Sequence, residues 1–254
     1  MSKKKNLSRI DVEDVSTYEA ENQSKLINLN GTGNKIKLED IPIKIKCLTS
    51  KQKELKQLIE SKDFIICSGP AGTGKTFFSL LMALHLLKTE PKYKKIILIK
   101  SLQVVKGEEV GFLKGELDTK LAPYHYSYTG NLDKIFGSKF ITKSLMESGI
   151  IEILPIAYSR GVTLDSSIIL IDETQNITMD IFKTISTRIG KDSKMIFLGD
   201  REQSDLTNKK NSCLDKILQS FKETDFVGTL EFAEEDCVRN GLIPKLLKII
   251  NEIK

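Results

Sequence analysis

The sequence predicts an α/β domain with a mainly parallel sheet and helices on both of its faces. Six short apolar runs rich in β-branched residues have the length of buried strands, at residues 64–67, 96–99, 150–154, 168–171, 195–198 and 226–230. The runs lack the polar–apolar alternation of a half-exposed strand, which favours a parallel sheet covered on both sides. Helical patterns separate them, and alternating strands and helices predict right-handed crossovers.

The helix candidates follow in chain order. A first helix opens at residues 48–52, and a second at 76–88 is apolar nearly all round, as expected for a helix packed against a sheet. Isoleucines recur at every fourth position over 181–189, and Gly190 supplies a C-terminal stop. Pro244 suits the first turn of a last helix.

Composition divides the chain into a flexible N-terminal extension, residues 1–46, and a domain, residues 47–254. The extension is polar and charged without sustained periodicity, apart from a short strand expected near 41–45. A length of 254 residues suits one domain with an appendage.

Composition also argues against several protein classes. The longest nearly unbroken apolar stretch, 77–87, is shorter than the ~18 residues that a membrane span needs. The N-terminal lysines are followed by polar sequence, so we expect no secretory signal and a cytoplasmic location. The four cysteines and two histidines are scattered, which indicates neither a disulfide framework nor a zinc site. A formal charge of +5 is compatible with a polyanionic partner and equally with an ordinary solvated surface.

A phosphate-binding loop follows the first strand and opens the helix at 76–88. Its sequence, GPAGTGKT, matches G-x-x-x-x-G-K-[ST] and comprises Gly69, Pro70, Ala71, Gly72, Thr73, Gly74, Lys75 and Thr76. The glycines let backbone N–H groups surround phosphate oxygens, and the helix N-terminus adds its positive dipole end. Lys75 would reach the β- and γ-phosphates, and Thr76 would ligate Mg²⁺.

Two adjacent carboxylates end the strand at 168–171. Asp172 suits Mg²⁺ coordination, usually through water, and Glu173 is placed to orient and deprotonate an attacking water. An ordinary polar turn is the alternative interpretation of the pair. A carboxylate next to water indicates hydrolysis, whereas a small-molecule kinase must position an acceptor group.

Three further residues are candidates because of their positions. Gln203 follows the strand at 195–198 and would contact the γ-phosphate and the lytic water. Arg201, beside it, would serve either the phosphates or the surface. Gln52, in the helix before the phosphate loop, offers a donor and an acceptor, as reading an adenine edge requires.

Several segments together resemble one family. In order after the phosphate loop come GEEVGFLKG at 107–115, PIAYSRGVTL at 155–164, IILIDETQN at 168–176, LGDREQSDL at 198–206 and DCVR at 236–239. This series resembles the PhoH-like family, the phosphate-starvation-inducible P-loop proteins related to superfamily 1 helicases. The resemblance implies a three-layer RecA-like P-loop NTPase domain, binding of ATP, Mg²⁺-dependent hydrolysis and an action on nucleic acid.

The chain departs from the family pattern at two places. Lys100 and Ser101 stand where the resemblance predicts Arg-Pro, and Val162 stands where it predicts a second arginine. Both departures remove a bidentate donor, which lysine does not replace.

The resemblance also bears on assembly. Superfamily 1 helicases use two RecA-like domains, and the segment 206–254 is too short for a second one. We therefore expect the site to be completed in trans, with Arg239 or Arg160 of one subunit reaching the ATP of its neighbour as an arginine finger. A homo-oligomeric ring, such as a hexamer, closes such head-to-tail interfaces.

A basic cluster points to single-stranded RNA or DNA as a partner. It comprises Lys88, Lys92, Tyr93, Lys94 and Lys95, followed by Lys100 and Lys106. Such a surface would bind phosphates, and Tyr93, Phe112 or Tyr158 would stack a base. A solvated helix end explains the cluster at 88–95 equally well.

Three function classes remain. An ATP-driven nucleic-acid motor predicts hydrolysis that single strands stimulate, and it is the preferred interpretation. A nucleotide-gated regulatory or assembly module predicts slow, unstimulated hydrolysis. A small-molecule kinase is disfavoured, since the chain has only five arginines and no arginine-rich lid.

Overall fold

The computed structural model describes residues 37–101, 117–156, 161–204, 206, 212–239 and 249, with only the backbone of 117–126. Six parallel strands form one sheet in the order β3-β2-β4-β5-β1-β6. The strands are β1 (Phe64–Ser68), β2 (Lys95–Lys100), β3 (Ile151–Pro155), β4 (Ser167–Asp172), β5 (Lys194–Gly199) and β6 (Val227–Glu231). All six predicted strands are confirmed, and the central strands β1, β2, β4 and β5 are almost entirely buried.

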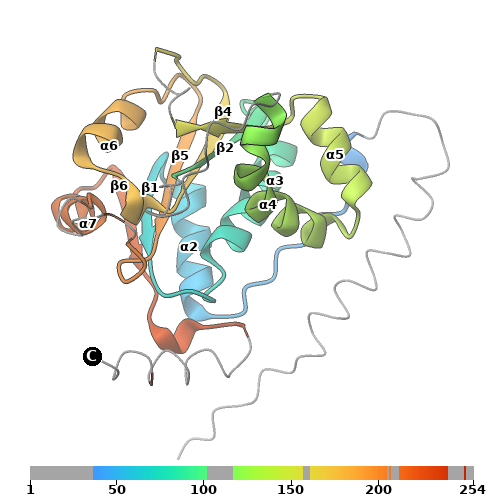
Figure 1. The fold of residues 1–254 in the computed structure, drawn as a ribbon. Helices are drawn as coiled ribbons and strands as arrows, with labels where there is room; N and C mark the ends of the chain where they lie inside the picture. The colour runs from blue at the N-terminus through green and yellow to red at the C-terminus, as the bar shows by residue number, and fades with distance from the viewer. Residues whose placement is uncertain are drawn as a thin grey trace, which may run out of the picture.

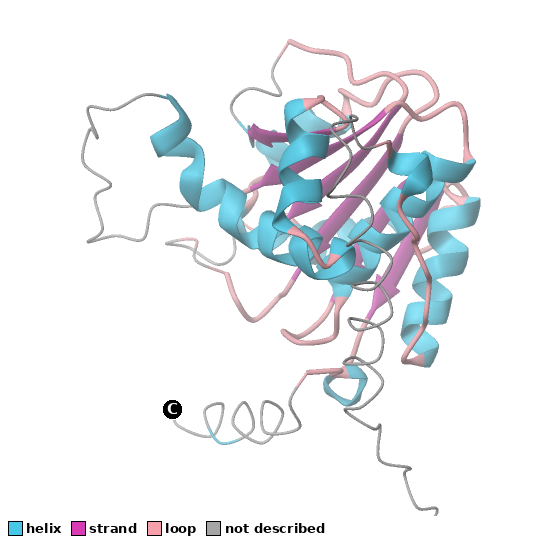
Figure 2. Ribbon diagram, turned by 90° about the vertical axis from the view of Figure 1, so that its right-hand side faces the viewer, coloured by secondary structure: helices cyan, strands magenta, loops and turns pink. Residues whose placement is uncertain are grey.

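Helices cover both faces of the sheet (Figures 1 and 2). They are α2 (Ser50–Ser61), α3 (Lys75–Thr89), α4 (Leu117–Phe136), α5 (Lys139–Glu147), α6 (Met179–Ser186) and α7 (Leu214–Phe221). The first four pack on one face and the last two on the other, which gives two separate clusters of buried side chains. Neighbouring strand residues such as Ile65 and Ile66 belong to opposite clusters, as the two-residue period of a strand requires. The predicted three-layer RecA-like α/β fold is confirmed.

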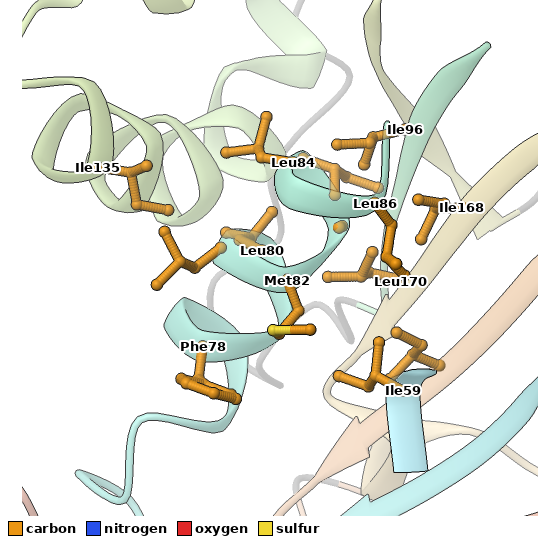
Figure 3. Close-up of a cluster of buried hydrophobic side chains, with 14 of the residues drawn as sticks. Ile59, Phe78, Leu80, Met82, Leu84, Leu86, Ile96, Ile135, Ile168 and Leu170 are labelled. Atoms are coloured by element: carbon orange, nitrogen blue, oxygen red, sulfur yellow. The ribbon is translucent and has the colours of Figure 1, made fainter. Parts of the chain in front are cut away.

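Helix α3 is largely buried. Its side chains Leu80, Met82 and Leu84 are buried completely. Figure 3 shows them in the cluster that also contains Ile135 of α4 and Leu170 of β4. A helix enclosed by the sheet and by other helices needs apolar residues nearly all round, as its sequence has.

Two local predictions are wrong. No strand forms at 41–45; Ile41 instead follows a short 3-10 helix, Leu38–Asp40, and buries its side chain in the core. Helix α6 contains Ile181 and Ile185 but ends at Ser186, before Ile189 and Gly190. Ile189 forms a parallel bridge with Leu164 instead, so sheet-like pairing ends the helix early.

The structure adds features without a sequence prediction. Helices α4 and α5 lie between β2 and β3 in the chain. Within the described part of the chain, no helix is long and apolar enough to cross a membrane. Of the last predicted helix, near Pro244, only residue 249 is described, and it is helical.

Candidate active site

The candidate residues meet at one edge of the sheet. Strand β5 pairs with β1 on one side and with β4 on the other, and all three are parallel. Their carboxyl ends, at Ser68, Asp172 and Gly199, therefore lie at the same edge, where ligands bind in open α/β sheets.

The phosphate loop has a backbone that depends on glycine. Gly72 and Gly74 have φ of 88° and 81°, a region that other residues rarely adopt. Gly69 is required by close approach, since a Cβ atom there would lie 2.5 Å from Cβ of Phe232. Helix α3 begins at Lys75, directly after the left-handed Gly74, so its N-terminus points into the loop.

The ammonium group of Lys75 lies inside this loop. Its Nζ donates to the carbonyl oxygens of Gly69 at 2.6 Å and Pro70 at 2.8 Å, and to Thr73 Oγ1 at 3.3 Å. Burial lowers the pKa of Lys75, because the charged form loses hydration. A phosphate in the loop would replace these neutral acceptors with charged ones, which bind an ammonium more strongly.

The two predicted metal ligands are in contact. Thr76 Oγ1 donates to Asp172 Oδ2 at 3.1 Å, although the residues are 96 positions apart. Burial, and next the charge of Glu173, raise the pKa of Asp172 to about 6. A hydroxyl and a carboxylate that converge beside a phosphate loop are the oxygen donors that Mg²⁺ prefers, so these residues fit the ion.

Glu173 adjoins this pair in a backbone conformation that is rare for its residue type. Its φ and ψ are 57° and 42°, in the left-handed region. Its Oε2 accepts from Gln175 Nε2 at 2.8 Å, and its Oε1 lies 3.7 Å from Nζ of Lys100. The side chain is 34% exposed, so the predicted base is accessible to water.

Sequence reasoning missed Gln175, which joins two of the predicted segments. Its Nε2 also donates to the carbonyl oxygen of Gln203 at 3.2 Å, and its Oε1 accepts from the N–H of Asp200 at 2.9 Å. The side chain is 1% exposed. The polar residues after the strand at 168–171 indicated a loop in which Gln175 could act. The sequence did not indicate which groups Gln175 would contact. The side chain of Gln203 itself is exposed.

Gln52 lies against the phosphate loop. Its Nε2 donates to the carbonyl oxygen of Thr73 at 3.4 Å, and its Oε1 accepts from the N–H of Leu48 at 2.8 Å. Thr49 caps helix α2 by accepting from the N–H of Gln52, which fixes where the helix begins. The structure thus brings Gln52 to the loop, and its role in reading adenine stays a prediction.

The two candidate arginines that the structure describes have different surroundings. Arg239 is exposed and lies beside Gly72 of its own phosphate loop, where the N–H of Val238 donates to the Gly72 carbonyl oxygen at 2.9 Å. Arg160 lies outside the described residues, as does the segment 107–115. Arg201 forms ion pairs with Asp215 at 2.6 Å and with Glu231 at 2.8 Å. Of the two roles considered for Arg201, these pairs favour a surface role over phosphate binding.

The expected stacking role of Tyr93 is wrong. Its side chain is only 4% exposed and belongs to the hydrophobic core, so no base can stack on it. Phe112 and Tyr158 lie outside the described residues.

The sequence is similar to that of known proteins. The model of the PhoH family, whose members are called PhoH-like proteins, matches residues 44–251. A PhoH-like protein of Bacillus subtilis is 39% identical over 204 residues, which cover 80% of this chain and 63% of that protein. Protein PhoH of Escherichia coli is 37% identical over 190 residues, covering 74% of this chain and 53% of that protein.

Among solved structures, the large terminase of a thermophilic bacteriophage aligns with a TM-score of 0.49 at 13% identity, covering 80% of this chain and 50% of that one. The chain spans 63% and 53% of the lengths of the two curated relatives named above. With a family match over most of its length, the chain belongs to the PhoH-like family.

Proposed function

We propose that this protein binds ATP with Mg²⁺ and hydrolyses it. The observation that carries the proposal is the contact of Thr76 Oγ1 with Asp172 Oδ2, 3.1 Å apart, at a site where Asp172 and Glu173 also interact electrostatically with the ammonium of Lys75. These residues would supply what a phosphoryl-transfer site needs, namely a phosphate-binding loop, a cation, oxygens for a metal ion and a base, and their proximity supports the proposal.

The loop and Lys75 bind and orient the phosphates. Backbone N–H groups of the loop and the N-terminus of α3 face the β- and γ-phosphates. Lys75 exchanges its two carbonyl partners for phosphate oxygens. The buried positive charge of Lys75 is then paired with the negative charge of the phosphates. Thr76 and Asp172 would hold Mg²⁺, which when bound neutralises charge on the phosphate oxygens.

Glu173 supplies the base. It accepts a proton from the water that attacks the γ-phosphorus, while the bond to the leaving ADP oxygen breaks and that oxygen keeps the electron pair. Gln203 would contact the γ-phosphate from the end of β5, and Gln52 would read the adenine. Arg239 and Arg160 are the candidates for an additional cation, supplied by a neighbouring subunit of a ring.

We propose further that hydrolysis is coupled to single-stranded RNA or DNA. The relationship of the family to superfamily 1 helicases supports this coupling, and the formal charge of +5 is compatible with it. The second candidate is a nucleotide-gated assembly module, which the contacts of Val238 and Arg239 with the phosphate loop favour, since a shift of the loop would reach the C-terminal segment.

The test is phosphate release from Mg²⁺-ATP with and without single strands, at two salt concentrations. Lys75→Ala and Glu173→Gln serve as controls that remove the phosphate-binding cation and the base. Stimulation by single strands that falls with salt supports the motor, because phosphate contacts release counterions. Basal hydrolysis that both variants lose and single strands leave unchanged supports the gated module. Hydrolysis that persists in Lys75→Ala refutes the proposed site.

A further inference from the structure

Both carboxylate oxygens of Glu173, the proposed base, have a side-chain neighbour. Gln175 Nε2 donates to Oε2 of Glu173 at 2.8 Å, and Lys100 Nζ lies 3.7 Å from Oε1. The left-handed backbone of Glu173 is unfavourable for a residue other than glycine and persists only where surrounding contacts hold the residue. The side chains of Gln175 and Lys100 therefore influence the orientation of the Glu173 carboxylate.

Lys100 approaches from a different strand. It is the last residue of β2 and stands opposite Asp172 of β4 in the register of the sheet. Its side chain is only 13% exposed, and its charge opposes the rise in the pKa of Asp172. A cation at this depth faces both carboxylates of the candidate site.

A second lysine of the same strand provides a comparison. Lys95, at the other end of β2, pairs with Glu152 at 2.9 Å, and both side chains are 34% exposed. An exposed pair of this kind contributes little. Lys100 loses more hydration and makes a longer contact, and a desolvated ion pair is weak evidence for a stabilising role. A role in orienting the Glu173 carboxylate explains the position of Lys100 better than a contribution to stability does.

We propose that Lys100 is a positioning residue for ATP hydrolysis, which together with Gln175 clamps the Glu173 carboxylate toward the attacking water. The proposal rests on the proposed function of this site. Lys100 acts through Glu173 and not on the phosphates, which are the partners of Lys75. A base misplaced by about 1 Å loses up to 10²-fold in rate, so the clamp affects turnover and not nucleotide binding.

The test compares Lys100→Met with Lys194→Met, the same change at a buried lysine that begins β5 and lies 3.4 Å from Asp63, at the amino end of its strand. We expect Lys100→Met to lower kcat by about 10- to 100-fold with KM within about twofold of wild type. Lys194→Met is expected to leave both constants unchanged. Affinity for a fluorescent ATP analogue, measured by anisotropy, should be equal in all three proteins. Lys100→Arg restores a cation and should recover most of the rate.

A double-mutant cycle separates this role from direct phosphate contact. If Lys100 acts through Glu173, adding Lys100→Met to Glu173→Gln lowers kcat no further. Losses that multiply, a changed KM or an unchanged kcat in Lys100→Met overturn the inference while leaving the proposed function intact. If the wild-type protein shows no hydrolysis that depends on Lys75, the proposed function fails and the inference fails with it. Circular dichroism of each variant confirms that it folds.

Discussion

Replacing Asp172 by asparagine should stabilise the protein when no metal or nucleotide is present. Burial and the charge of Glu173 raise the pKa of Asp172 from 3.8 to about 6, so the folded state disfavours the ionised carboxylate. A shift of about two units at 1.36 kcal/mol per unit corresponds to about 3 kcal/mol as an upper limit. Asparagine removes the charge and keeps an oxygen that accepts from the Thr76 hydroxyl. We therefore expect a gain of about 1–3 kcal/mol at pH ~7.5.

The gain should depend on pH with a defined sign. Because the folded pKa lies above the unfolded one, the penalty of wild-type Asp172 is complete above about pH 6 and absent below pH 3.8. The difference in the free energy of unfolding between variant and wild type should therefore shrink as the pH falls from ~7.5 toward ~4. Urea denaturation at several pH values measures it.

A matched control and a ligand experiment complete the test. Asp192→Asn makes the same change at an exposed, left-handed position that asparagine tolerates, and it should alter stability little. Mg²⁺-ATP at about a hundred times its Kd should stabilise wild type by about 2.7 kcal/mol and Asp172→Asn much less. An Asp172→Asn protein that is no more stable than wild type at neutral pH, or a gain that does not change with pH, would refute the reasoning.

Three further predictions concern packing and assembly. Gly69→Ala should destabilise the protein by about 1–3 kcal/mol in urea denaturation, because its Cβ would lie 2.5 Å from Cβ of Phe232; unchanged stability would mean that the contact is loose. Tyr128→Phe should cost about 1–2 kcal/mol in thermal unfolding, because the hydroxyl donates to a buried β2 carbonyl oxygen at 2.9 Å; a neutral result would contradict that assignment. Mixing Lys75→Ala with Arg239→Ala subunits should restore hydrolysis above that of either variant if Arg239 acts in trans; no restoration would place its action within one chain.

Much of the fold could be predicted because its signals are local. Each strand is a short β-branched run, such as 168–171, and the phosphate loop is defined by glycine, lysine and threonine at fixed spacing. Predictions failed where a tertiary contact overrode a local pattern. The isoleucine period continued to Ile189, but pairing with Leu164 ended helix α6 at Ser186.

The sequence by itself determined the parallel sheet, the phosphate loop and the carboxylates at the end of β4, since these depend on residue types that are adjacent in the chain. Only the tertiary structure decided what surrounds them. It brought Thr76 to Asp172, placed Lys100 beside Glu173 and inserted Gln175 between two loops. The physical reason is that such contacts join residues from different helices, strands and loops, whose distances follow from the sheet order and register and not from spacing in the chain.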